Sequence, residues 1–151
     1  MRLMNIEIES VLQDEFEEVL AVIKSGLFHH VDAVFGWDDD FQRNRLKTEY
    51  QSNWFHWIYI EKQRVGLLCF KPYENAFHIH FLVVAPSQQG KKIGTCVMSM
   101  VHDKAIANKK DRVTLSSFTR NNKAIAFYES IGYETIEADD NFVSMEWKPA
   151  S

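Results

Sequence analysis

The chain has 151 residues, the length of one ordinary domain, and 46% of them are hydrophobic, which excludes an intrinsically disordered protein. Its formal net charge of -4 leaves no excess of positive charge and argues against nucleic acid as a partner. We therefore expect a single domain over residues 1–151.

The two cysteines indicate a reducing compartment. Cys69 and Cys96 lie in apolar segments and in no metal-ligand spacing, so we expect reduced thiols and no metal site. No apolar run approaches the roughly 20 residues that span a bilayer. The first residues become charged too early for a signal peptide. These features predict a cytoplasmic protein without a membrane partner.

The N-terminal third predicts one strand followed by helices. Residues 1–8 contain alternating apolar side chains, which favour a strand. From Val11 to Ile23 apolar residues recur at spacings of three and four, which predicts a helix. Ser10 is the expected N-cap of this helix, and Gly26 its expected end.

A second helical segment is expected over residues 27–47, with a break at Gly36 and Trp37. Three strands joined by short turns follow, and short turns favour antiparallel pairing. Their expected bounds are Trp54–Ile60, Val65–Phe70 and Ala76–Val84.

The last third alternates helices with strands. We expect helices at Lys91–Ala107 and Asn121–Ser130, the second ended by Gly132. Strands are expected at Arg112–Ser117, Tyr133–Ile136 and Phe142–Trp147. The predicted order β-α-α-β-β-β-α-β-α-β-β indicates an α/β sheet of mixed direction with helices on its faces.

The segment 83–95 carries the clearest chemical signal. A buried strand runs into a polar turn that opens a long helix, whose first amide groups have no partner within the helix. Gly90 and Gly94 permit close approach, and Lys91 and Lys92 add positive charge. Such a turn suits a diphosphate, although the same pattern also serves as a purely structural turn. Neither a Walker A nor a dinucleotide-binding glycine motif is present.

Two segments resemble motifs of the GNAT family of N-acetyltransferases. Residues 89–94 are similar to its acyl-CoA loop, [QR]-x-x-G-x-[GA], with Lys92 standing where the middle glycine is usual. Residues 121–133 resemble its N-x-x-A-x-x-[FL]-Y-x-x-x-G-[FY] segment, through Asn121, Ala124, Tyr128, Gly132 and Tyr133. On these two motifs the chain is identified as a member of that family.

The resemblance implies a fold and a cosubstrate. The implied fold is α/β (α+β), a mixed and mostly antiparallel sheet flanked by helices, whose splayed central strands form the acyl-CoA cleft. Acetyl-CoA is the implied cosubstrate, with no metal. The resemblance places its binding on Leu82, Val83, Val84, Gln89, Gly90, Lys91, Lys92, Ile93, Gly94, Thr95 and Asn121. A plain N-cap is the alternative role of Asn121.

The resemblance also implies that Tyr128 protonates the leaving thiolate, whereas a core position is its alternative role. The strand before the loop lacks the Glu that often serves as the family's base. His78 and His80 lie two residues apart on one face of that strand, and either imidazole can accept a proton. They can equally be structural histidines, and Glu74 is a weaker candidate for the base.

Acceptor specificity in such enzymes comes from the first helices, here His30, Trp37 and Asp38. Acidic residues could bind a cationic amine and Trp37 could stack on it, or the acids could simply begin a helix. We expect acetyl transfer directly to a primary amine of a small molecule. A protein or peptide acceptor, and an acyl-CoA-binding module without turnover, are the alternatives. A homodimer is left open.

Overall fold

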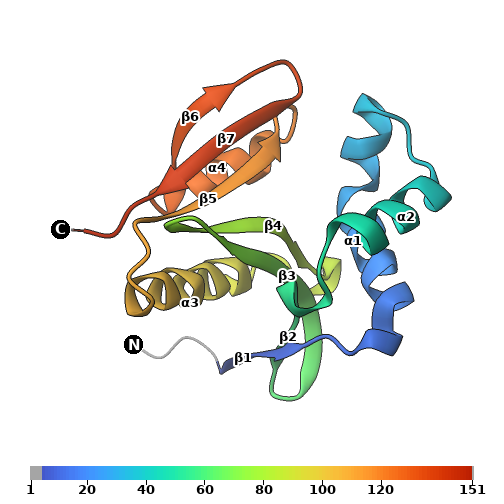
Figure 1. Cartoon of the computed structure of the whole chain (residues 1–151), viewed down its shortest axis with the longest axis horizontal. Helices are drawn as coiled ribbons and strands as arrows, with labels where there is room; N and C mark the ends of the chain where they lie inside the picture. The colour runs from blue at the N-terminus through green and yellow to red at the C-terminus, as the bar shows by residue number, and fades with distance from the viewer. Residues whose placement is uncertain (1–4, 151) are drawn as a thin grey trace. The chain divides into compact units, whose positions relative to one another are not determined.

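The computed structural model describes residues 5–150, and its elements follow the predicted order (Figure 1). The strands are β1 (Ile6–Ser10), β2 (Phe55–Ile60), β3 (Gln63–Tyr73), β4 (Ala76–Val84), β5 (Arg112–Phe118), β6 (Glu134–Ala138) and β7 (Phe142–Trp147). The helices are α1 (Phe16–Val34), α2 (Asp39–Glu49), α3 (Ile93–Ala107) and α4 (Asn122–Ser130). Three short 3-10 helices are η1 (Gln13–Glu15), η2 (Ser52–Trp54) and η3 (Pro86–Gln88). Residues 1–4, part of the first predicted strand, lie outside the described residues.

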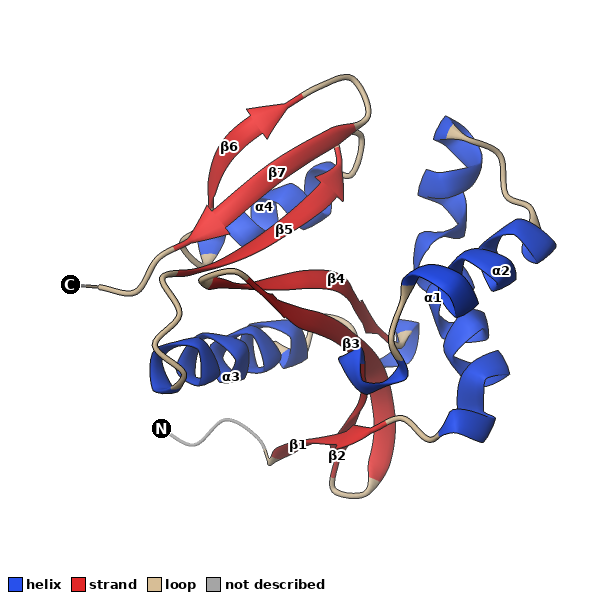
Figure 2. Cartoon of the chain, in the orientation of Figure 1, coloured by secondary structure: helices blue, strands red, loops and turns tan. Residues whose placement is uncertain are grey.

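The strands form one sheet in the hydrogen-bonded order β1-β2-β3-β4-β5-β7-β6 (Figure 2). Antiparallel pairing joins β1 to β2, β2 to β3, β5 to β7, and β6 to β7. Strands β4 and β5 pair in parallel, from Ala76 with Arg112 to Ile79 with Leu115. The mixed, mostly antiparallel sheet is the predicted one. The later residues of β4 and β5 lie beyond this paired stretch.

The chain contains two compact units. The first comprises the described residues up to Cys69 together with Phe81–Cys96, and the second comprises Phe70–His80 and the described residues from Val97 onward. Strands β3 and β4 and helix α3 each pass from one unit to the other. Each unit is described by itself below, and the expectation of a single domain stays a prediction.

The prediction that Gly26 ends the first helix is wrong, because α1 continues through it to Val34. A Cβ atom at Gly26 would lie 2.7 Å from Cγ1 of Val83, so this glycine lets the helix approach strand β4 closely. The helix ends instead at Gly36, which has a φ of +80° and donates its amide to the carbonyls of Val31 and Asp32.

The prediction that Ser10 caps the first helix is also wrong. Ser10 is the last residue of β1 and pairs with His56. The helical segment begins after Leu12, whose amide donates to the Glu15 carboxylate at 2.7 Å, while the Glu15 amide donates to the Leu12 carbonyl. A carboxylate inside the first turn therefore replaces the expected hydroxyl cap.

Strand β3 continues past its predicted end at Phe70 to Tyr73 and includes Pro72, which is exposed at the outer end of the strand. Strand β4 and strand β7 have the predicted bounds. Residues 65–70 are all buried, which explains why this strand reads as a continuous apolar run.

In the first unit α1 and α2 lie side by side (Figure 1). Val19, Leu20 and Ile23 of α1 join Leu46 of α2 and the buried face of β2 and β3 in one apolar core. Two ion pairs tie the helices together, Arg43 with Glu17 and Lys24 with Asp39.

Among residues 5–150 no single helix is long and apolar enough to cross a membrane, although the bent pair Gln13–Val34 and Asp39–Glu49 passes on length and composition.

The close approach of β3 to β4 predicts a strong effect of Gly66→Ala. A Cβ atom there would overlap the backbone carbonyl oxygen of Val83 and crowd Ile58. Backbone atoms cannot rotate away as a side chain can, so we expect a loss of about 3 kcal/mol in the free energy of unfolding. Urea unfolding measures this loss.

Gly36→Ala is the matched control for Gly66→Ala. No atom lies within 4 Å of its Cβ position, and only the left-handed backbone conformation opposes the substitution. We expect this variant to lose about 1 kcal/mol. Equal losses in the two variants would contradict the close approach of β3 and β4.

Candidate active site

In the first unit, β4 leads through η3 into the turn that opens α3. The side-chain amide of Gln89 reaches back and donates to the Val84 carbonyl at 3.0 Å. Gly90 has a φ of +81° and Lys92 a φ of +64°, so both adopt the left-handed conformation. Lys92, which stands where the motif usually has a glycine, thus takes a backbone conformation that favours glycine.

The start of α3 presents amide groups that no helical carbonyl accepts. The first intrahelical bond runs from the Cys96 amide to the Lys92 carbonyl at 3.1 Å, and the amides of residues 93–95 precede it. Ile93 is buried and anchors this turn, whereas Lys91 and Lys92 are exposed. An anion at this turn would meet unpartnered amides, the positive end of the helix dipole and two ammonium groups.

The end of β4 has one buried and two half-buried residues. Val83 is buried against Gly26, while Leu82 and Val84 on either side of it are half-buried. The next amide along the chain, that of Ala85, donates to the backbone carbonyl of Val65 on β3 at 2.8 Å. Residues 82–84 are therefore held to their neighbours through Val83 and the Ala85 amide.

In the second unit, the two histidines of β4 lie on one face of the strand, as their spacing predicts. Their ring centroids are 4.9 Å apart, with the rings at 79° to each other. His78 is paired in register with Thr114 of β5, and its Nδ1 is hydrogen-bonded to the Thr114 hydroxyl at 2.8 Å. Burial, and secondarily the Lys71 ammonium, lower the pKa of His78, so its ring is neutral at pH 7. His80 follows the last pair of the β4–β5 ladder.

Asn121 immediately precedes helix α4, and Tyr128 lies within it. The side-chain oxygen of Asn121 accepts from the Ala124 amide at 3.2 Å, so its role as N-cap is confirmed. The Tyr128 ring packs against Phe127 and against the edge of Tyr133. Among the described residues its hydroxyl makes no hydrogen bond. Burial raises the pKa of Tyr128 to about 12, so the phenol keeps its proton at any physiological pH.

The sequence did not predict the cluster of His102, Tyr133 and Trp147, in which Tyr133 contacts the Tyr128 ring. The imidazole of His102 on α3 is stacked on Trp147 at 3.8 Å and hydrogen-bonded through Nε2 to the Tyr133 hydroxyl at 2.8 Å. Burial lowers the pKa of His102 to about 4 and raises the pKa of Tyr133 above its usual range. This neutral, hydrogen-bonded cluster fixes the ring that contacts Tyr128. The spacing of β7 could have suggested that Trp147 points inward, but not that it meets His102.

The residues predicted to bind the acceptor belong to the first unit, where Asp38 and Trp37 serve local structure. Asp38 caps α2 by accepting from the Phe41 amide at 2.9 Å. Trp37 donates to Asp39, and the Lys24 ammonium lies 5.8 Å from the centre of the Trp37 ring. The acidic run thus begins a helix, as the alternative interpretation held. His30 is half-buried on α1. The acceptor role of these residues stays a prediction.

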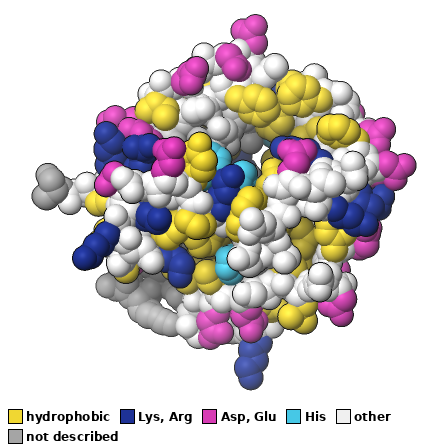
Figure 3. All heavy atoms as spheres, in the orientation of Figure 1, with side chains coloured by type: hydrophobic (Ala, Val, Ile, Leu, Met, Phe, Trp, Pro, Cys, Tyr) yellow, Lys and Arg dark blue, Asp and Glu magenta, His cyan; other side chains and the backbone are white. Residues whose placement is uncertain are grey.

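The predicted residues divide between the two units. The loop, the end of β4 and the predicted acceptor residues lie in the first unit, whereas His78, His80, Asn121 and Tyr128 lie in the second. Within residues 5–150 no group of three or more His, Cys, Asp or Glu side chains could hold a metal ion. Acidic and basic side chains are interspersed on the face shown in Figure 3.

Comparison with known proteins gives a consistent result. Residues 12–133 match the model of the acetyltransferase (GNAT) family. An acetyltransferase of Yersinia pestis is 25% identical over 130 residues, which cover 86% of this chain and 89% of that protein. An uncharacterised N-acetyltransferase of Schizosaccharomyces pombe is 30% identical over 106 residues, and the match covers 58% of this chain and 42% of that relative's length.

Among solved structures, the PaiA N-acetyltransferase of Thermoplasma acidophilum in complex with coenzyme A has a similar fold. The TM-score is 0.76 at 16% sequence identity, and the match covers 97% of this chain and all of that one. At this identity the likeness concerns the fold alone.

The conformation of Lys92 predicts that Lys92→Gly stabilises the protein. A non-glycine residue in the left-handed region costs roughly 1–2 kcal/mol, and the greater freedom of glycine in the unfolded chain offsets only part of that gain. We expect a net rise of about 0.5 kcal/mol in the free energy of unfolding, measured by urea denaturation.

Lys91→Gly is the control, because Lys91 is an exposed neighbour without a positive φ. Glycine should there destabilise the protein slightly through the entropy of the unfolded chain. If both glycine variants lose stability to the same extent, the left-handed conformation of Lys92 is wrong.

Proposed function

Because the chain belongs to the acetyltransferase (GNAT) family, we propose that it transfers an acetyl group from acetyl-CoA directly to a primary amine of a small molecule. The observation that carries the proposal is the turn at residues 89–95, in which Lys92, at the position of the motif's usual glycine, has a left-handed backbone conformation that favours glycine. We also propose a cytoplasmic location, which the free state of Cys69 and Cys96 supports.

Acetyl-CoA would bind on the first unit through the turn and the end of β4. The amides of residues 93–95 would hold the diphosphate, with Lys91 and Lys92 beside it. The amide-containing arm of the cofactor would pair with the backbone of Leu82 and Val84 as an added strand does. The coenzyme A complex of the Thermoplasma neighbour supports this choice of ligand. Gln89 would then release the Val84 carbonyl that it holds in the free protein.

The reaction needs a neutral amine, because an alkylammonium ion has no lone pair to attack the thioester. We assign the base to His80 rather than His78. His78 is committed to Thr114 within the β4–β5 ladder, whereas His80 lies just beyond its last pair. His78, held by Thr114, would fix the orientation of His80 through the contact between their rings. His80 would take the proton as the nitrogen attacks the acetyl carbon.

When the tetrahedral intermediate collapses, the carbon–sulfur bond breaks and the thiolate needs a proton. Tyr128 would donate it, since its hydroxyl makes no hydrogen bond among the described residues and stays protonated up to high pH. Its raised pKa makes it a weak acid in isolation. A thiolate in the same water-poor surroundings also becomes more basic, because burial disfavours its charge as well. Burial therefore raises the pKa of the donor and that of the acceptor together, and proton transfer from Tyr128 to the thiolate stays feasible.

The substrate class is tested by an acceptor screen. Release of coenzyme A thiol from acetyl-CoA would be followed with polyamines, aminoglycosides, amino acids and short peptides as acceptors. Turnover with a small amine supports the proposal. Turnover confined to peptides would contradict the small-molecule acceptor and indicate a protein or peptide acceptor instead. Tight acetyl-CoA binding without turnover on any amine would instead indicate a binding module.

Tyr128→Phe should lower kcat while leaving the affinity for acetyl-CoA nearly unchanged. Phenylalanine keeps the ring packing against Phe127 and Tyr133 but removes the proton donor. General acid catalysis is worth about 10²–10⁴-fold, and the loss belongs in kcat because the proton moves only in the transition state. Steady-state kinetics on an accepted amine measures it. A folded variant with full activity would make Tyr128 a core residue only.

His80→Gln should change the pH profile of kcat/KM. A protonated imidazole cannot accept a proton, so the wild-type rate should fall at acidic pH, where His80 is protonated. The variant should lose that acidic limb together with most of its activity. Tyr128 should add no basic limb below about pH 11, because its pKa is about 12.

His78→Gln is the matched control for the base. The glutamine amide can still bond Thr114, so we expect a moderate loss of kcat with the acidic limb retained. If the limb disappears in this variant and persists in His80→Gln, His78 is the base and the assignment of His80 is wrong.

A further inference from the structure

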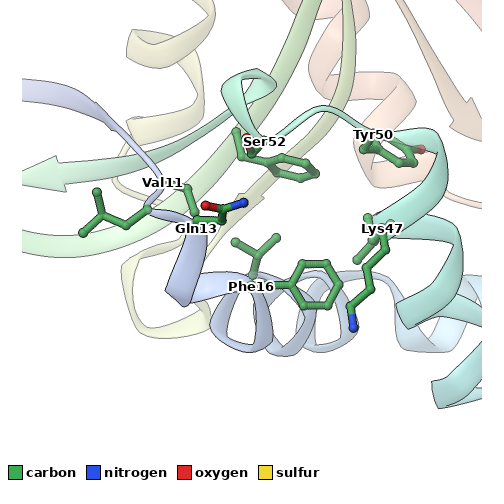
Figure 4. A pocket seen from close by; sticks show the side chains of 10 residues that line it. Val11, Gln13, Phe16, Lys47, Tyr50 and Ser52 are labelled. Atoms are coloured by element: carbon green, nitrogen blue, oxygen red, sulfur yellow. The ribbon is translucent and has the colours of Figure 1, made fainter.

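A cavity of about 380 Å³ lies in the first unit, among residues that acetyl transfer does not use (Figure 4). Its volume is at the lower end of the range for small-molecule sites. We call it the Phe16–Tyr50 pocket. It is lined by Val11, Leu12, Gln13, Phe16, Val19, Leu46, Lys47, Tyr50, Ser52 and Phe55.

Most of the lining is apolar. Six of the ten side chains are aliphatic or phenylalanine, and the ring of Tyr50 adds a further apolar face. At the rim Leu12 is 63% exposed, a large apolar side chain left in contact with water. The Phe16 ring and the Gln13 amide extend from neighbouring positions into the space between the helices (Figure 4). An aromatic or aliphatic body would cover this surface and be stabilised by leaving water.

The pocket carries a single charge, the ammonium group of Lys47. Its Nζ lies 5.3 Å from the centre of the Phe16 ring. Among the described residues Lys47 forms no ion pair, since the carboxylate of Glu17 is held by two hydrogen bonds from Arg43. The pocket therefore offers one cation, with the Gln13 amide and the Ser52 hydroxyl as additional polar groups. This combination suits a carboxylate and opposes a cationic ligand.

An aromatic layer stands between this pocket and the end of β4. Tyr50 and Phe55 line the pocket and also pack against Phe81, with ring centroids 5.5 and 6.4 Å from it. Phe81 directly precedes Leu82, where the cofactor arm is proposed to bind. A ligand in the pocket would thus contact the layer rather than the strand behind it.

We propose that the Phe16–Tyr50 pocket is a second ligand site, which binds small monocarboxylates with an aromatic or aliphatic body. The apolar body packs between Phe16, Leu46 and Phe55, and the carboxylate pairs with Lys47. The site depends neither on the acetyl-CoA loop nor on the proposed reaction, so its test stands whether or not acetyl transfer is found.

Calorimetric titration of the full chain with 3-phenylpropionate tests the site. The control ligand is 3-phenylpropylamine, which has the same phenylethyl body but carries an ammonium group instead of the carboxylate. We expect saturable binding of the carboxylate and at least tenfold weaker binding of the amine. Lys47→Met keeps the length of the side chain and removes its charge. It should weaken carboxylate binding about 1.5-fold to fivefold, the range for a solvent-accessible ion pair.

Lys104→Met is the matched control, because Lys104 is an exposed lysine on α3 outside the pocket. It should bind the carboxylate as the wild type does. Ser52→Trp, at an exposed position, should fill the pocket and abolish binding while the melting temperature stays near that of the wild type. Absence of saturable wild-type binding, or equal affinity in Lys47→Met, would overturn the proposal.

Amide chemical-shift mapping with the same probe locates the ligand. The changes should centre on residues 11–19 and 46–55, and saturating acetyl-CoA should leave the affinity for the carboxylate within about twofold. Competitive displacement by acetyl-CoA, or shifts centred elsewhere, would also overturn the second site. Failure of acetyl-CoA to bind at all would count against the proposed function and leave this test intact.

Discussion

The first unit depends on the close packing around Val83. The Val83 side chain fills the space that a Cβ would take at Gly26 on α1, and the Val83 carbonyl occupies the space that one would take at Gly66 on β3. Two glycines therefore let a helix and a strand approach the same residue of β4. This packing holds Leu82 and Val84 in place and sets the point from which the chain enters the turn at residues 89–95. The proposed cofactor site rests on that contact.

Several polar residues that resemble ligand-binding groups in the sequence serve local structure first. Asp38 and Asn121 each accept a backbone amide at a helix start, and Gln89 holds the Val84 carbonyl. A helix start needs such acceptors whether or not a ligand binds there. Capping does not exclude a second role, because an Asn amide group retains its two donor hydrogens when its oxygen is used. The same residue can stabilise the fold and still meet a cofactor.

Burial shifts the pKa values of three titratable groups in the second unit. It raises the pKa of Tyr128 and lowers those of His78 and His102, so all three are neutral at pH 7. A neutral phenol can donate a proton, while a neutral imidazole can accept one. His102 is engaged with Tyr133 and Trp147 and supports the ring beside Tyr128. Desolvation is the largest cause of all three shifts, and it keeps Tyr128 protonated for the proposed proton transfer.

The sequence by itself determined the order of helices and strands, the mixed sheet and the family, because apolar periodicity and two spaced motifs are local properties of the chain. It also determined that His78 and His80 share a face, since strand geometry alternates side chains. Only the tertiary structure decided that Gly26 lies inside a helix, that Glu15 replaces Ser10 at a helix start, and that Lys92 adopts a glycine conformation. Each of these depends on which distant or neighbouring atoms fill the space around the residue. The Phe16–Tyr50 pocket and the His102 cluster were hidden for the same reason, because their side chains come from segments that only folding brings together.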